Sequence, residues 1–166
     1  TGYLDGIMAA QQKIYGYNFL EEVLPDDIVT AFRKHFPGFY TPPENFCCDD
    51  RAILAQLYLG TEVSALERMS VMKLLGEHYT VDLFTGSDTR RLPVKNHGLA
   101  KTLTEMPLIF HYSKINLNMT SKSIRTGLPL RIFDILGCGG FCLANYQTEL
   151  TDYFTPGSDL DCYTCE

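Results

Sequence analysis

Hydroxyl and basic side chains gather in one stretch of the sequence, residues 118–129. The stretch follows a short apolar run and leads into another, and its hydroxyl residues include Thr120, Ser121, Ser123 and Thr126. It lies within an acid-free window, residues 106–133, whose basic residues are Lys114, Lys122, Arg125 and Arg131. Because hydroxyls, guanidinium groups and the unpaired N–H groups at a helix start all bind anions, phosphate binding is the chemistry that this pattern favours.

The phosphate hypothesis assigns a diphosphate to one set of residues: Ser123, Arg125, Thr126, Gly127 and Arg131. Arg131 falls one turn into a predicted helix, where its planar guanidinium presents a fork of donors to phosphate oxygens. The alternative is a solvated basic loop that balances acidic neighbours. The Gly-x4-Gly-Lys-Ser/Thr pattern is missing, so the stretch is not a P-loop.

A second group of residues has the side chains that recognise ribose or sugar hydroxyls. Its members are Asn118, Asn145, Tyr146, Gln147 and Glu149. Amides and the phenol supply neutral hydrogen bonds, and the Glu149 carboxylate accepts from paired hydroxyls. For Glu149 the alternative is an ordinary acid in the first turn of a helix. Asp134 lies in a short, otherwise apolar helix, so it needs a partner or an exposed position.

Two smaller features have both structural and functional interpretations. The glycines of Gly137-Cys-Gly-Gly140 either admit a ligand close to the backbone or let a helix and a strand pack tightly, and we favour packing. His97 precedes Gly98 after a predicted strand, so it either lines a cleft or is a plain loop histidine. No histidine spacing suggests a metal, and no catalytic residue is identified.

The six cysteines predict reduced, structural thiols and a cytoplasmic protein, because their density is far below that of a disulfide scaffold. Cys162 and Cys165 have the CxxC spacing, which makes a zinc or redox site a third and weaker hypothesis. A second CxxC would strengthen it, and the sequence has none.

Composition limits the classes of protein that the chain can belong to. With 166 residues, 45% hydrophobic and 20% charged, it is globular and of a size for one ordinary domain. A net charge of −6 argues against a nucleic-acid binder. No apolar run reaches the ~18 residues of a transmembrane helix. The first residue is not Met and the last lies just after a predicted strand, so we expect a piece of a longer protein.

The elements that must position these residues change in kind along the chain. Residues 1–78 carry helical periodicity over 4–15, 26–36 and 52–78, the last interrupted at Gly60. Residues 79–166 alternate: strands are predicted over 79–84, 114–118, 141–144 and 160–163, and helices over 101–112, 129–136 and 148–154. This order predicts an α/β fold, a Rossmann-like and mostly parallel sheet with helices on both faces, preceded by a helical segment.

The run from Ser123 to Leu150, SIRTGLPLRIFDILGCGGFCLANYQTEL, followed by Phe154-Thr-Pro-Gly157, resembles the core of the CgeB-like (spore maturation protein) glycosyltransferases of the GT-B type. The upstream runs 105–110 and 113–118 also fit the bacterial members of that family. The resemblance covers residues 79–166, and residues 1–78 resemble the helical segment that precedes this domain.

This resemblance implies the donor-binding, C-terminally truncated half of a two-domain enzyme, inactive alone, whose missing N-terminal domain would bind the acceptor. The donor is then a nucleotide-sugar, with no metal and no further cofactor. Arg125 and Arg131 fit the diphosphate site, and Glu149 fits the carboxylate that contacts the ribose. Asp134 matches the second acid of the family's pair, whereas Thr126 stands where the first acid is expected.

A different class of function also fits the sequence. A non-catalytic interaction or assembly module could retain the GT-B fold, and the Thr126 departure agrees with that alternative. A protein that binds a partner but never transfers or hydrolyses a sugar donor would support it.

Overall fold

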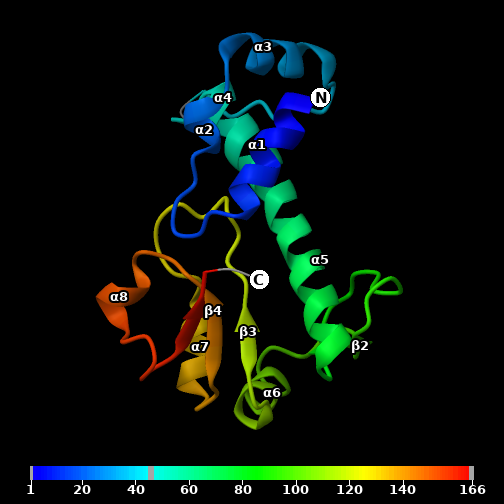
Figure 1. The fold of residues 1–166 in the computed structure, drawn as a ribbon, viewed down its shortest axis with the longest axis vertical. Helices are drawn as coiled ribbons and strands as arrows, with labels where there is room; N and C mark the ends of the chain where they lie inside the picture. The colour runs from blue at the N-terminus through cyan, green and yellow to red at the C-terminus, as the bar shows by residue number, and fades with distance from the viewer. Residues whose placement is uncertain (1, 45–46, 165–166) are drawn as a thin grey trace. The chain divides into compact units, whose positions relative to one another are not determined.

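The computed structural model describes residues 2–44 and 47–164, which divide between two compact units. Unit 1 holds the chain up to Ala65 together with the short segment Ser121–Arg125. Unit 2 holds Leu66–Thr120 and the chain from Thr126 onward. The chain therefore passes from unit 2 into unit 1 and back within the stretch that the sequence marks for phosphate binding. Figure 1 traces this course by colour.

Unit 1 is helical, which confirms the predicted helical segment. Its elements are α1 (Gly2–Gln12), α2 (Leu20–Val23), α3 (Asp26–His35), α4 (Asp50–Ala52), the π-helix η1 (Ile53–Leu59) and the start of α5 (Gly60–His78). In α3 two aspartates occupy the first turn, and Arg33, Lys34 and His35 occupy the last. These charges oppose the helix dipole at both ends and stabilise the helix. The cap of α3 is Pro25, with Asp26 as its first residue.

Gly60 marks a change of helix type. The predicted interruption of the long helix is here a switch from the π-helix η1 to the α-helix α5. The Gly60 N–H donates to the Ala55 carbonyl, the i→i+5 pattern of a π-helix. A Cβ on Gly60 would lie 3.2 Å from that carbonyl oxygen and 3.4 Å from the Ser123 backbone nitrogen. The absence of a side chain thus lets residues 121–125 approach the helix closely.

The core of unit 1 forms where α1, α2, α3 and η1 present apolar side chains to one another. Its buried members are Leu4, Leu20, Leu24, Val29, Leu54, Ala55, Leu59 and Val63. A group of rings around Tyr58 extends the core, with the Phe32, Phe36 and Phe39 rings all within 6 Å of the Tyr58 ring. This apolar contact stabilises unit 1 far more than its short helices do alone.

Unit 2 contains the parallel strands, which confirms the α/β class. The strands β1 (Asp82–Leu83) and β2 (Lys95–Asn96) pair with each other. The second sheet has the order β3-β4-β5, from β3 (Asn116–Asn118), β4 (Cys142–Asn145) and β5 (Asp161–Tyr163), and all its neighbours are parallel. The strands β1, β3 and β5 are shorter than predicted, and β4 has the predicted length but lies one residue later. Strand β2 was not predicted, because its two polar residues carry no strand periodicity.

Unit 2 also contains helices, which precede its strands or connect them. They are the remainder of α5, α6 (Met106–Tyr112), α7 (Leu130–Gly137) and α8 (Leu150–Tyr153). Helix α6 begins at Met106, later than the predicted start at residue 101, and Pro107 lies in its first turn. Pro129 is the cap of α7 and not its first helical residue. Helix α7 buries Ile132 and Ile135 in a core with Cys142, Ala144, Leu150 and Leu160. Figure 1 shows α7 behind the strands β3 and β4 that it contacts.

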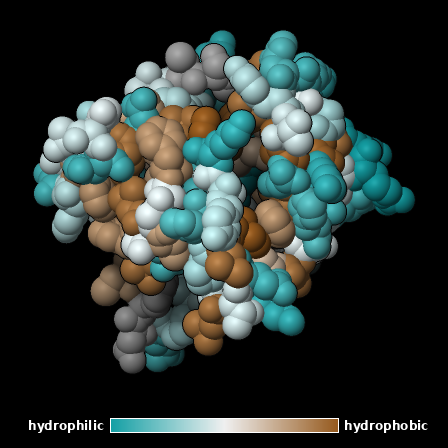
Figure 2. Space-filling view, turned by 90° about the horizontal axis from the view of Figure 1, so that it is seen from below, coloured by the Kyte–Doolittle hydropathy of each residue, from teal (hydrophilic) through white to brown (hydrophobic). Residues whose placement is uncertain are grey.

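The exposed surface mixes polar and apolar side chains. Several large apolar residues of unit 2 are exposed, among them Leu99, Leu103, Tyr112 and Leu130. Figure 2 shows brown and teal residues interspersed over the face that it draws, so apolar residues do not gather there into one continuous patch. In the part of the chain that the structure describes, no helix is both long and apolar enough to cross a bilayer.

Candidate functional site

The carboxyl ends of β3 and β4 bring together polar residues that are far apart in the sequence. Because the two strands are parallel, with Asn118 opposite Ala144, the residues that follow each strand meet at one edge of the sheet. Ligands of open α/β sheets bind at this edge. Of the residues predicted to contact a sugar, Asn118, Asn145, Tyr146 and Gln147 all lie here.

Asn145 ties the end of β4 to the segment after β3. The Thr120 N–H donates to Asn145 Oδ1 at 2.8 Å, and Asn145 Nδ2 donates to the Thr120 carbonyl at 3.0 Å. Both residues are buried. The side-chain amide thus makes the two bonds that a further residue of backbone pairing would make, and it extends the contact between the strands past the end of β3.

The Thr120 hydroxyl is the centre of a buried chain of hydrogen bonds. It accepts from Asn118 Nδ2 at 3.1 Å and donates to Gln147 Oε1 at 2.9 Å. Gln147 in turn donates from Nε2 to the Gly127 carbonyl at 3.3 Å. The amides predicted to recognise a sugar are therefore bonded to the protein itself, and they shape the loops that surround the strand ends.

Both the backbone N–H and the carbonyl of Gly127 form hydrogen bonds with side chains. Its N–H donates to Glu149 Oε1 at 3.3 Å, while its carbonyl accepts from Gln147. Its φ of +81° lies in the left-handed region, which favours glycine over other residues. The loop before α7 is therefore attached to the loop before α8 through two side chains, and the half-buried Glu149 already contacts the loop that is predicted to bind phosphate.

Arg131 occupies the first turn of α7 and is exposed. Its guanidinium carbon lies 5.2 Å from the centre of the Phe110 ring, and Nη1 lies 3.6 Å from Met106 Sδ. Within residues 2–44 and 47–164, no carboxylate forms an ion pair with it. Asp134, one turn further along α7, is also exposed. The charge of Arg131 is thus available to an anion from solvent.

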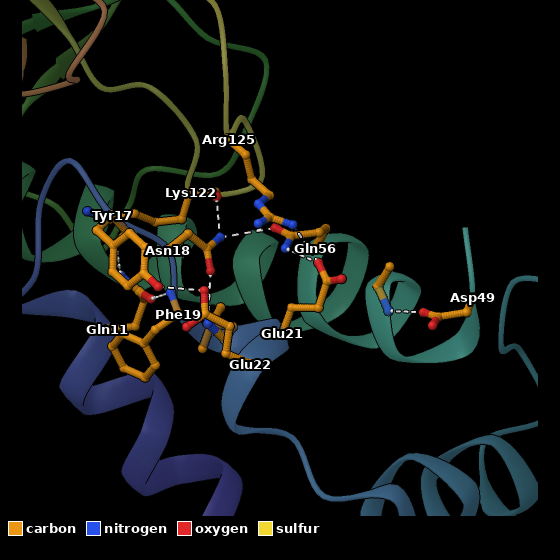
Figure 3. Close-up of polar contacts among 12 residues, drawn as sticks. Gln11, Tyr17, Asn18, Phe19, Glu21, Glu22, Asp49, Gln56, Lys122 and Arg125 are labelled. Carbon is orange, nitrogen blue, oxygen red and sulfur yellow. Dashed lines mark hydrogen bonds and ion pairs between the residues drawn. The ribbon is translucent and has the colours of Figure 1, made fainter. Parts of the chain in front are cut away.

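Arg125 forms an ion pair within unit 1. Its Nη1 donates to Glu21 Oε2 at 2.7 Å, and that carboxylate also accepts from Gln56 Nε2 at 3.3 Å. Figure 3 shows how Asn18 continues the network, donating from Nδ2 to Gln56 Oε1 at 3.0 Å and to the Lys122 carbonyl at 2.6 Å. The segment 121–125 is thereby held by residues that lie about a hundred positions earlier in the chain.

The other hydroxyls of the predicted phosphate loop divide between the two units. Ser123 Oγ lies 2.8 Å from Ser121 Oγ in unit 1, and Ser121 Oγ lies 3.1 Å from Ser64 Oγ. Thr126 begins the return into unit 2 and is exposed. Lys122 is buried, with Nζ 3.1 Å from the Ile14 carbonyl and 3.9 Å from the centre of the Tyr15 ring. Its charge is used inside unit 1.

Gly140 of the glycine-rich run packs against its neighbours. A Cβ there would lie 2.4 Å from the Phe110 carbonyl oxygen and 2.8 Å from Asn116 Nδ2. A Cβ on Gly137 would meet nothing within 4 Å. The close approach at Gly140 is to the protein itself, which supports the packing interpretation over the ligand interpretation.

His97 follows β2 and pairs with a carboxylate of β1. Its Nε2 lies 2.6 Å from Asp82 Oδ1, and its ring stacks on that of Phe84 with the centroids 4.9 Å apart. The carboxylate fixes the orientation of the imidazole. A place for His97 beside a ligand stays a prediction.

The cysteines divide by burial. Burial raises the pKa of the Cys142 thiol to about 11, whereas Cys47 and Cys48 are exposed. Burial, and after it the neighbouring Asp161 carboxylate, also raises the pKa of Cys162. Cys165, the second cysteine of the predicted CxxC site, lies outside the described residues. Among those residues no group of three or more His, Cys, Asp or Glu side chains could hold a metal ion.

Sequence reasoning missed the residues that hold these loops. Thr120 appeared only as one hydroxyl among several, since nothing local shows that its proton is directed to Gln147. The sequence around Asn18, Glu21 and Gln56 did not indicate their roles in this network, because their partners are remote in the chain. Hydrogen bonds between distant segments have no period or spacing from which they could be predicted.

A comparison with protein families identifies the class of protein to which the chain belongs. A model of the family described as glycosyl transferase-like matches residues 62–165, well over half of the chain. The chain therefore belongs to the glycosyl transferase-like family. Searches of curated proteins and of solved structures found no significant match.

Proposed function

We propose that this chain is the nucleotide-sugar-binding half of a GT-B glycosyltransferase of the CgeB-like kind. One observation carries the proposal: the family match over residues 62–165 includes the parallel strands β3, β4 and β5 and the polar loops at their carboxyl ends. A second domain, which would bind the acceptor, belongs to the same proposal. We assign no catalytic base.

Arg131 and the start of α7 would bind the diphosphate of the donor. Transfer breaks the bond between the anomeric carbon and a diphosphate oxygen, so negative charge develops on the leaving group. An exposed guanidinium and the positive end of a helix dipole stabilise that charge. The loop residues Thr126 and Gly127 adjoin this helix start, and they complete the proposed phosphate contacts in unit 2.

Glu149 and Asp134 would contact the ribose or the sugar. Glu149 offers a half-buried carboxylate whose Oε1 accepts from Gly127 N–H. A carboxylate has further lone pairs on both oxygens, which can accept from hydroxyls. Tyr146 is half-buried and would add a phenol. In this proposal the buried amides of Asn118, Asn145 and Gln147 support the loops that surround the donor site.

Isothermal calorimetry with a panel of nucleoside diphosphates, on the full-length protein, tests the proposal. The wild type should bind one of them, and Arg131→Ala should weaken that binding by about 1.5–3 kcal/mol, the usual contribution of a hydrogen bond to a charged group. Arg90→Ala is the matched control, because Arg90 is exposed and pairs with Asp88 within its own loop. Failure of the wild type to bind any nucleotide would refute the proposal.

A non-catalytic interaction module is the second candidate, and one observation favours it. Arg125 and the three amides are already bonded within the protein, which reduces the groups available to a donor. Release of nucleoside diphosphate from a nucleotide-sugar by the full-length protein would exclude this candidate. Binding of a protein partner with no nucleotide binding would favour it.

A further inference from the structure

Thr120 links Asn118 to Gln147 in a buried chain of hydrogen bonds. Its hydroxyl has one proton, and Asn118 Nδ2 can only donate to it, at 3.1 Å. The single proton is therefore left for Gln147 Oε1, 2.9 Å away. The Thr120 hydroxyl thus holds the oxygen end of the Gln147 amide.

Gln147 connects Thr120 to Gly127. With Oε1 turned to Thr120, its Nε2 is the group that faces the Gly127 carbonyl, at 3.3 Å. A reversed amide would place an oxygen against that carbonyl and would lose this bond, whereas the Thr120 hydroxyl could accept from the turned Nε2. The Gly127 carbonyl, which can only accept, therefore fixes which way the amide faces, and the Thr120 hydroxyl completes the chain by donating to Oε1. Both Thr120 and Gln147 are buried.

Gly127 joins this chain to the predicted donor contacts. Its carbonyl is held by Gln147 and its N–H by Glu149 Oε1, 3.3 Å away. The residue has no side chain of its own to fix it, and its φ of +81° leaves the loop dependent on these two bonds. Helix α7 begins three residues later and carries Arg131 in its first turn.

We propose that Thr120 and Gln147 are positioning residues of the donor site, which hold Gly127 and Glu149 where the diphosphate and the ribose bind. This inference rests on the proposed function. A loop that is already in place does not lose conformational freedom when the ligand binds, so affinity depends on groups that never touch the ligand. Loss of the Thr120 hydroxyl should therefore weaken nucleotide binding.

Two substitutions at Thr120 separate the hydroxyl from the size of the side chain. Thr120→Val keeps the shape and removes the proton, whereas Thr120→Ser keeps the hydroxyl. Calorimetry with the nucleoside diphosphate that the wild type prefers should show affinity about fivefold or more lower for Thr120→Val. Thr120→Ser should stay within about twofold of the wild type, because the conservative residue restores the chain.

Gln147→Glu tests the next step of the chain. A carboxylate still accepts from Thr120, but it places an oxygen against the Gly127 carbonyl, so affinity should fall about as far as in Thr120→Val. Thr151→Val is the matched control: its hydroxyl donates to the Thr148 carbonyl at 3.1 Å at the exposed start of α8, so its affinity should not change.

The backbone amide signal of Gly127 in a ¹⁵N–¹H spectrum provides a readout that a purely structural role would not move. It should shift in Thr120→Val and Gln147→Glu and keep its wild-type position in Thr120→Ser. If Thr120→Val does not fold, the affinity of Gln147→Glu and the position of its Gly127 amide signal still test the inference.

Wild-type affinity in Thr120→Val and Gln147→Glu, with only a lower melting temperature, would overturn the inference and leave the proposed function standing. Equal losses in Thr120→Ser and Thr120→Val would also overturn it, because the hydroxyl would then not matter. No nucleotide binding by the wild type would instead overturn the proposed function, and this inference with it.

Discussion

Arg125 and Arg131 have the same side chain and lie six positions apart, yet their surroundings give them different parts. Arg125 shares its charge with Glu21 at 2.7 Å, whereas Arg131 is exposed over the Phe110 ring. An exposed ion pair contributes little to stability, but it reduces the field that a nearby anion experiences. At the scale of single residues, Arg131 is the better candidate for the donor phosphates.

Burial changes the chemistry of the Cys142 thiol. Its thiol pKa is raised to about 11 from an ordinary value of 9.0, so in the folded protein it stays protonated at pH 8. Because the thiolate is the reactive form, iodoacetamide at pH 8 should modify the exposed Cys47 and Cys48 first and spare Cys142. Peptide mass spectrometry, with and without denaturant, checks this order.

The same shift gives the direction of a pH effect on stability. The unfolded chain loses the Cys142 proton near pH 9.0, while the folded chain keeps it up to about pH 11. The unfolded state is therefore favoured as the pH rises through that interval, and the contribution of this thiol to stability falls. Modification of Cys142 as fast as of Cys48 in the native protein would contradict both expectations.

At the scale of elements, residues with a clear period or a proline were predictable. The end of α3 before Pro37 and the change at Gly60 follow from local rules, whereas α6 begins at Met106 and not near residue 101 as predicted. Strand β1 lies within the strand predicted over 79–84, whereas the two-residue strand β2 is too short and too polar to show a period. Pairing between them adds stability that the sequence around either strand alone does not reveal.

The candidate site was predictable in its place but not in its internal bonds. Residues that follow parallel strands must meet at one edge, so the grouping of Asn118, Asn145 and Gln147 follows from the strand pattern. Which of them bond to the protein depends on Thr120, whose partners lie up to 27 positions away. Their roles toward a donor stay predictions until a ligand is bound.

Tight packing of Gly140 against α6 and β3 predicts a different effect for two glycines of one run. Gly140→Ala would place a Cβ 2.4 Å from the Phe110 carbonyl oxygen, so backbone must shift and stability should fall by about 1–3 kcal/mol. Gly137→Ala is the matched control, because open space surrounds its position at the end of α7. It should leave stability unchanged or slightly raised.

Urea unfolding followed by circular dichroism measures both glycine variants. A loss of stability in Gly140→Ala alone assigns the close approach to packing. Equal stability of the two variants would contradict the packing interpretation and would return Gly140 to the list of candidate ligand contacts.

At the scale of the whole molecule, the family region and the compact units do not coincide. The family match begins at residue 62, yet its segment Ser121–Arg125 belongs to unit 1. That segment is bonded to Asn18, Glu21 and Ser64, of which the first two lie outside the family region. We infer that the helical segment before the family region is part of the structure that supports this loop.

Leu54→Ala tests that inference within the intact chain. Leu54 is fully buried in the core of unit 1, so its truncation should cost about 2–5 kcal/mol. The backbone N–H of Lys122 donates to Ser64 Oγ at 2.8 Å, and that of Ile124 donates to the Ser121 carbonyl at 2.9 Å. Both amides should exchange faster with solvent deuterium in the variant, although they lie about seventy positions from the substitution.

Leu57→Ala is the matched control, because Leu57 lies on the same π-helix and is half exposed. It should leave the exchange of residues 121–125 close to that of the wild type. If the segment 121–125 belongs to unit 1, its amides should exchange faster together with those around Leu54, while the exchange of the β4 amides in unit 2 stays unchanged. Unchanged exchange at Lys122 and Ile124 in Leu54→Ala, with faster exchange elsewhere in unit 1, would show that the loop is held independently of the helices.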